Sequence, residues 1–244
     1  MNEFTNTIDV VGEQALMTSI IDRSIAEIKD NYVTSIGAYA FYGCSKLTTA
    51  DFPAATSIGA YAFYGCSKLT TADFPAATSI DTYAFYGCSK LTTADFPAVT
   101  SIGAYAFENC SALTDVDFPL VTNIGIDAFY HCRALTIASF SSTVEVFPYA
   151  FEDCNRLTAL ILRSETICTL KNTNAFSKCY HILGTKNSTY NPNGDKDGYI
   201  YVPSALIDSY KAAANWSTYA AQFRALEDYT VDGTTTGELD PNKI

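Results

Sequence analysis

The sequence has few of the side chains that catalytic and metal sites use most often. Its 244 residues include only two histidines, His131 and His181, and 17% of the residues are charged. It has no CxxC pair, phosphate-binding loop or dinucleotide fingerprint, and no serine or cysteine lies in plausible register with a histidine. We therefore expect no enzymatic activity, no cofactor and no metal ion.

Basic residues and long apolar runs are also scarce. The 15 lysines and arginines form no cluster and are outnumbered by 26 acidic residues, giving a formal charge of −11, which argues against a nucleic-acid partner. No apolar run approaches the ~20 residues that a membrane-spanning helix needs. Residues 1–7 contain neither the basic nor the apolar region of a secretory signal, so the sequence leaves the compartment open.

What the sequence does contain is a repeat of 22 residues, in a chain that is 48% apolar. A period of about 20–50 residues is typical of stacked structural repeats, each of which buries its apolar side against its neighbours. Three copies are nearly identical. The columns that recur are Phe41, Phe63, Phe85, Phe107, Phe129 and Phe151; Cys44, Cys66, Cys88, Cys110, Cys132 and Cys154; Leu47, Leu69, Leu91, Leu113, Leu135 and Leu157; and Ile36, Ile58, Ile80, Ile102 and Ile124, closed by Val146.

Each repeat predicts two short extended segments and a turn. Because strand side chains alternate, residues 47–52 place Ala50 inward and Thr49 and Asp51 outward, and a proline ends the segment. Residues 56–58 form the second extended piece, and residues 60–64 predict one helical turn that drives a phenylalanine inward.

The residue after that turn predicts a left-handed backbone. Glycine, asparagine, histidine and aspartate all tolerate positive φ, and these are the residue types found in the column Gly43, Gly65, Gly87, Asn109, His131 and Asp153. The next residue in each repeat is the cysteine, which then points into the core. We interpret the cysteines as a ladder of reduced, buried thiols, since free cysteine behaves as a small hydrophobe.

The pattern Leu-x-x-Ala-x-Phe-Pro followed by Thr-Ser-Ile-Gly-x-Tyr-Ala-Phe-x-x-Cys-x-x-Leu resembles the BspA-like leucine-rich repeat family over about residues 18–183. The sequence departs from the family by placing alanine at the second leucine and phenylalanine at the third. The resemblance implies a curved, right-handed α/β solenoid of the leucine-rich-repeat type, with short strands and short helical turns. It also implies a bacterial surface or secreted protein that binds host or partner molecules.

Both ends of the repeat predict caps, because a solenoid must cover its terminal core. We expect an N-terminal helical cap over 1–24, with the helix itself at 13–22, and a solenoid over 25–183. An insertion loop and a helical C-terminal cap follow over 184–229. Within that cap, residues 204–214 predict a helix, Trp216 and Phe223 belong to a second apolar stripe, and 230–244 predicts a flexible tail.

Two outward-facing sets of residues are candidates for binding. The first is an acidic, threonine-rich strand face, and folding alone does not require its column of like charges. Its alternative interpretation is a solvated surface inherited from repeat duplication. The residues of this candidate face are Thr49, Asp51, Thr71, Asp73, Thr93, Asp95, Asp115 and Asp117.

The second set consists of tyrosines, which are enriched at contact surfaces. Such rings can bind sugars or proteins, or simply pack on the neighbouring coil. The columns are Tyr39, Tyr61, Tyr83, Tyr105 and Tyr149, and Tyr42, Tyr64, Tyr86 and Tyr130.

Three functional hypotheses remain. The main one is a non-catalytic scaffold that presents the acidic face to a protein partner. The alternatives are a carbohydrate-binding module that uses the tyrosine columns, and a structural spacer in a cell-surface or phage-type assembly. In each case we expect a monomer rather than an obligate oligomer.

Overall fold

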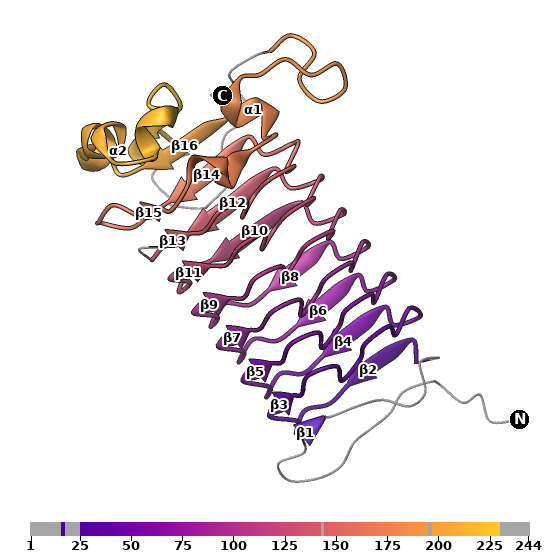
Figure 1. Ribbon diagram of the computed structural model, residues 1–244. Helices are drawn as coiled ribbons and strands as arrows, with labels where there is room; N and C mark the ends of the chain where they lie inside the picture. Colours follow the sequence, from indigo (N-terminus) through magenta and orange to yellow (C-terminus); the bar gives the residue numbers. More distant parts are fainter. Residues whose placement is uncertain (1–15, 18–24, 143, 195–196, 230–244) are drawn as a thin grey trace, which may run out of the picture.

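The computed structural model of the chain describes residues 16–17, 25–142, 144–194 and 197–229. Successive coils stack along one axis, so equivalent segments of neighbouring repeats lie side by side (Figure 1). In this part of the chain the strands form three sheets, of eight, four and five strands, and neighbouring strands within these sheets pair in parallel. The predicted repeat solenoid with short strands is confirmed.

The largest sheet takes one two-residue strand from each coil. Each strand pairs with its equivalent in the next coil, so that Ser57 pairs with Ser79 and Ile58 with Ile80. The inward isoleucines of this sheet are buried. Its strands, in order, are β1 (Leu16–Met17), β3 (Ser35–Ile36), β5 (Ser57–Ile58), β7 (Ser79–Ile80), β9 (Ser101–Ile102), β11 (Asn123–Ile124), β13 (Glu145–Val146) and β15 (Thr169–Leu170).

The other two sheets follow one another along the solenoid, with β10 next to β8 (Figure 1). The four-stranded sheet consists of β2 (Glu27–Lys29), β4 (Thr49–Asp51), β6 (Thr71–Asp73) and β8 (Thr93–Asp95). The five-stranded sheet consists of β10 (Asp115–Phe118), β12 (Ile137–Phe140), β14 (Ala159–Leu162), β16 (Tyr199–Val202) and β17 (Phe223–Ala225).

The core is built from columns of identical side chains. Phe85 is fully buried, and its ring stacks on those of Phe63 and Phe107 at centroid distances of 5.1 and 5.3 Å. All eight cysteines are free and buried, which confirms the interpretation of a thiol ladder. Six of the thiols also donate to a phenylalanine carbonyl of the preceding coil, as the Cys88 Sγ donates to the Phe63 carbonyl at 3.2 Å.

The turn of each repeat confirms the predicted left-handed column. The φ angles of Gly87, Asn109 and His131 are 70°, 61° and 60°. The expected helical turn is wrong, because Tyr61 also has a positive φ, of 58°. Every second backbone N–H group in this segment donates a hydrogen bond to a carbonyl of the next coil, where a helix would bond within the segment. For example, the Phe63 N–H donates to the Ala84 carbonyl at 2.7 Å.

The N-terminal helix expected over 13–22 lies outside the described residues except for Leu16 and Met17. At those two residues a helix is wrong, because they form β1 and pair in parallel with β3. The edge of β3 carries backbone N–H and C=O groups that need hydrogen-bond partners, and a strand that pairs with this edge supplies them. The flexible tail expected over 230–244 lies outside the described residues.

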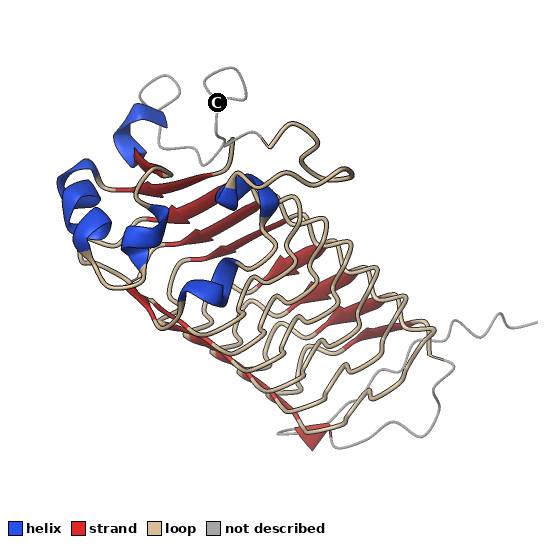
Figure 2. Cartoon of the chain, turned by 45° about the horizontal axis from the view of Figure 1, so that its top comes forward, coloured by secondary structure: helices blue, strands red, loops and turns tan. Residues whose placement is uncertain are grey.

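The helices gather at the C-terminal end of the solenoid (Figure 2). Residues 204–214 form a 3₁₀ turn and a shorter α-helix rather than one helix, and Phe223 lies in β17, which extends the sheet beyond β16. The phenylalanine column continues beyond Phe151 to Phe176, whose ring stacks on Phe151 at 5.5 Å, and Trp216 and Tyr219 contact Phe176. The helices are η1 (Thr173–Phe176), α1 (Tyr180–Leu183), η2 (Ser204–Leu206), α2 (Ile207–Ala212), η3 (Trp216–Tyr219) and η4 (Leu226–Tyr229).

Candidate functional site

The strand face brings the predicted acidic and hydroxyl side chains into two parallel columns. In one column Thr49 pairs with Thr71 and Thr71 with Thr93, while in the other Asp51, Asp73 and Asp95 pair in the same way. The alanines between them are buried, and the outward residues of β6 and β8 are exposed. Asp115 and Asp117 extend these columns on β10, the strand next to β8. We use the name "strand face" for these eight outward residues.

The carboxylates of the strand face have cations only near the two ends of the column, among the ion pairs of the described residues. Lys29, one coil earlier, pairs with Asp51, and Arg163 Nη1 lies 3.9 Å from Asp117 Oδ1. Between them, partial burial raises the pKa of the Asp73 carboxyl, and the charges of Asp51 and Asp95 raise it further, while the charge of Lys29 partly offsets this. The middle of the column is therefore a concentrated negative site, and among the ion pairs of the described residues none involves Asp73 or Asp95.

Beyond Asp117 the outward side of the sheet becomes apolar, a change that the sequence analysis did not identify. Ala159, Ile161 and Tyr201 form a buried cluster against which Ile137 and Leu226 pack. The signal was present in the sequence as Ala-Leu-Ile-Leu at 159–162, where the alternation of polar and apolar residues ends and all four side chains are buried. This region is packed structure, and it sets one border of the strand face.

The neighbouring line of threonines has a structural role. The Thr70 hydroxyl donates to the Thr48 carbonyl of the preceding coil at 2.9 Å, and the Thr92 hydroxyl donates to the Thr70 carbonyl at 3.2 Å. These bonds join adjacent coils, so this line belongs to the scaffold rather than to the strand face.

The two tyrosine columns lie side by side on the turn segments. The Tyr61 ring stacks on Tyr83 at 4.8 Å, and Tyr64 stacks on Tyr86 at 4.5 Å. The columns are tilted against each other, by 41° between Tyr61 and Tyr64. Sugar binding through these rings stays a prediction, and the ring faces that would stack on a sugar are already covered by neighbouring rings.

An open, shallow groove of about 480 Å³ runs along these tyrosines. We call it the tyrosine groove, and its lining residues are Tyr42, Tyr61, Tyr64, Tyr83, Tyr86, Tyr105 and Glu108. Glu108 takes the place of a tyrosine in the second column. Burial raises the pKa of its carboxyl to about 7, with a further contribution from the charge of Asp127.

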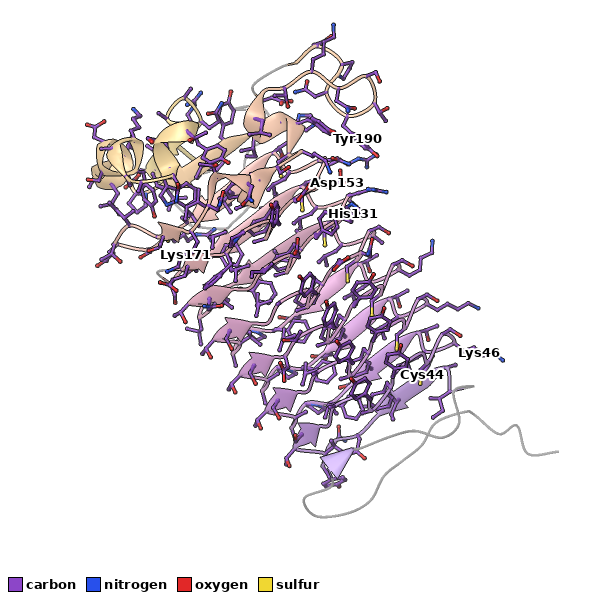
Figure 3. All side chains as sticks on the ribbon, in the orientation of Figure 1. Cys44, Lys46, His131, Asp153, Lys171 and Tyr190 are labelled. Carbon is purple, nitrogen blue, oxygen red and sulfur yellow. The ribbon has the colours of Figure 1, made fainter. Side chains whose placement is uncertain are left out.

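Beyond the groove, a polar network occupies the left-handed column. Figure 3 shows His131 and Asp153 on neighbouring coils, and the His131 Nε2 lies 3.0 Å from the Asp153 carboxylate. Arg133 donates to the same carboxylate oxygen from Nε and Nη2, at 3.0 and 2.9 Å. Every polar atom in these contacts serves an interaction between coils, and the arrangement provides no nucleophile.

The described part of the chain contains no group of three or more His, Cys, Asp or Glu side chains placed to hold a metal ion. None of its helices has both the length and the apolarity that crossing a bilayer would require.

Stacked parallel strands, a phenylalanine and cysteine core and short connecting turns define a leucine-rich repeat protein. The family model of the BspA type leucine rich repeat region matches residues 17–119 and 78–188, with 6 copies. This is more than half of the chain, and the protein therefore belongs to that family. Leucine-rich repeat proteins are generally non-catalytic scaffolds that bind proteins.

Two solved structures show the same fold. A leucine rich repeat protein of T. pallidum is 25% identical, with a TM-score of 0.58, and the match covers 63% of this chain and 77% of that one. A leucine-rich repeat protein from Bacteroides ovatus is 26% identical, with a TM-score of 0.52, and the match covers 84% of this chain and 50% of that one. The chain thus spans half the length of the second relative. No curated protein matches it.

Proposed function

We propose that this chain is a non-catalytic binding scaffold whose strand face contacts a protein partner with a positively charged surface. The observation that carries the proposal is the aligned carboxylate column of Asp51, Asp73 and Asp95. Equivalent residues on neighbouring strands lie about 5 Å apart, so these charges repel one another in the free protein. A basic partner would relieve this repulsion, and charge complementarity would speed its association.

The physical state of Asp73 supports this proposal. Its pKa is raised by partial burial and by its two neighbours, so ionised Asp73 disfavours the folded state, and its charge is not explained by a gain in folding stability. We also propose a location on a bacterial cell surface or outside the cell, as the family resemblance implies.

The test uses a panel of purified extracellular proteins that range from acidic to basic, immobilised and probed with this chain. We expect the binders to carry basic surfaces and to lose binding to the double variant Asp73→Asn, Asp95→Asn. The matched control removes two exposed charges elsewhere, by Glu165→Gln and Asp208→Asn. If every binder retains the double variant as well as it retains the control, the strand face is not the contact surface. Contacts through the ends of the solenoid would favour the spacer hypothesis instead.

A further inference from the structure

The tyrosine groove is a second surface, on the turns rather than on the strands. Its two walls are ladders of rings that stack at 4.5–4.9 Å and tilt against each other by 41–61°. Because the rings stack face to face, the groove is lined by ring edges and hydroxyl groups. Burial raises the pKa of the hydroxyls of Tyr64, Tyr83 and Tyr105, so they keep their protons at neutral pH.

The spacing of the ladders selects among peptide conformations. One coil advances by 4.8 Å from Tyr61 to Tyr83, so two coils advance by about 9–10 Å. A polyproline II helix advances about 9.3 Å in one turn of three residues and therefore meets equivalent tyrosines once per turn. An extended strand repeats about every 6.7 Å and an α-helix every 5.4 Å or so, and neither spacing matches.

The chemistry of the groove fits the same ligand. A polyproline II segment makes no internal hydrogen bonds, so its carbonyl groups need donors. Tyrosine hydroxyls can rotate to supply them, except that of Tyr105, which is hydrogen-bonded to Asp127. Aromatic-lined grooves are the usual docking sites of proline-rich segments. One end of this groove is acidic, because Glu108 lines it and Asp127 is close enough to raise the pKa of Glu108.

We propose that the tyrosine groove binds a proline-rich peptide in the polyproline II conformation, with a basic residue of the peptide at the Glu108 end. The groove spans the coils from Tyr42 to Tyr105 and accommodates roughly five residues of such a peptide. The site is separate from the strand face, so it stands or falls independently of the function proposed above.

The test measures fluorescence anisotropy with labelled peptides. One peptide carries six prolines followed by arginine, and a second carries the arginine before the prolines. A third replaces every proline by glycine and keeps the arginine. We expect one of the two proline peptides to bind, with at least about tenfold higher affinity than the glycine peptide, because polyproline II is preformed only in the former.

The variants separate the walls of the groove from its charged end. Tyr64→Ser with Tyr86→Ser changes the wall at positions outside the positive-φ column, and it should weaken binding about tenfold or more, as expected for aromatic contacts at the centre of an interface. Glu108→Gln should weaken binding about two- to fivefold, with an effect that fades in high salt. Asp208→Asn on α2 is the control and should bind as the unmodified chain does.

A cross-link on the unmodified chain keeps the proposal testable if the tyrosine variants do not fold. A proline peptide with a photoreactive group should attach to the turn segments between Tyr61 and Tyr105 and not to β4, β6 or β8. Equal binding of the glycine peptide would mean that charge alone is recognised and would overturn the proposal. So would the absence of binding by both proline peptides, whether or not a glycan binds in a Tyr64-dependent manner, or cross-links confined to the strands.

Discussion

Replacing Glu108 by glutamine should stabilise the protein at pH 8 and have little effect at pH 5. Glu108 is half-buried beside the tyrosines, and burial, together with the charge of Asp127, raises the pKa of its carboxyl from 4.5 to about 7. A carboxyl whose pKa is higher in the folded state binds its proton more tightly there than in the unfolded chain. Its ionised form therefore destabilises the fold. This penalty is absent below about pH 4.5, grows as the pH rises, and is complete above about pH 7.

The size of the effect follows from the same pKa values. A change from 4.5 to about 7 corresponds to an upper limit of about 3 kcal/mol. Because Glu108 is partly solvated, we discount this to about 1 kcal/mol. For a chain of this size the gain should raise the melting temperature by about 2–4 °C. Glutamine has nearly the same shape and carries no charge, so its place in the lining of the groove beside Tyr105 should be preserved.

The assay is thermal unfolding of both proteins at a series of pH values from 5 to 8. The melting temperature of the Glu108→Gln variant should exceed that of the unmodified chain by an amount that grows in the upper part of this pH range. Glu165→Gln, at an exposed position, serves as the control, and its difference from the unmodified chain should stay constant with pH. A Glu108→Gln difference that is equal at pH 5 and pH 8 would refute the argument.

Three further predictions concern the scaffold. Phe85→Ala should lower the free energy of unfolding by about 3–5 kcal/mol in denaturant titrations, because the ring is fully buried between Phe63 and Phe107; a loss below about 1 kcal/mol would contradict the stacked core. Asn109→Val should destabilise by about 1–3 kcal/mol, since a β-branched residue resists the φ of 61°. Asn109→Gly should be closer to the unmodified chain, and equal melting temperatures for the valine variant would be inconsistent with the left-handed backbone. The thiols should react with a disulfide reagent only on unfolding, because Cys88 is fully buried and burial raises its pKa; rapid labelling of the native protein would argue against this.

Much of the fold could be predicted because the repeat reports each position several times. A single glycine at position 43 does not predict a backbone conformation. In later repeats the same position is occupied by Asn109, His131 and Asp153, and the property that these residue types share with glycine is tolerance of positive φ. The structure has a positive φ at each of these positions. The repetition also predicted which strand residues point inward and which point outward. The structure agrees, since Ala50 and its equivalents are buried in every coil.

The turn was mispredicted because tyrosine carries no such signal. Tyr61 and the equivalent tyrosines have a positive φ, although tyrosine rarely does. Hydrogen bonds to the next coil stabilise this conformation; for example, the Tyr61 backbone N–H donates to the Thr82 carbonyl. Such bonds come from stacking and are invisible within one repeat. Asp127 occupies the same column, and it was the one residue whose type pointed to this conformation.

The candidate sites depend most on the places where the repeat changes. Identical coils present identical surfaces, so a partner that contacted only the first coils could bind in several registers shifted by one coil. Glu108 replaces a tyrosine, Asp115 replaces a threonine, and Asp127 replaces a second tyrosine, all within two adjacent coils. Each substitution alters one outward column while the buried phenylalanine and cysteine columns continue through it. A ligand that contacts these substituted residues can bind in only one position along the solenoid. Changes at these residues should therefore alter the binding specificity of both surfaces more than equivalent changes in the repeated coils.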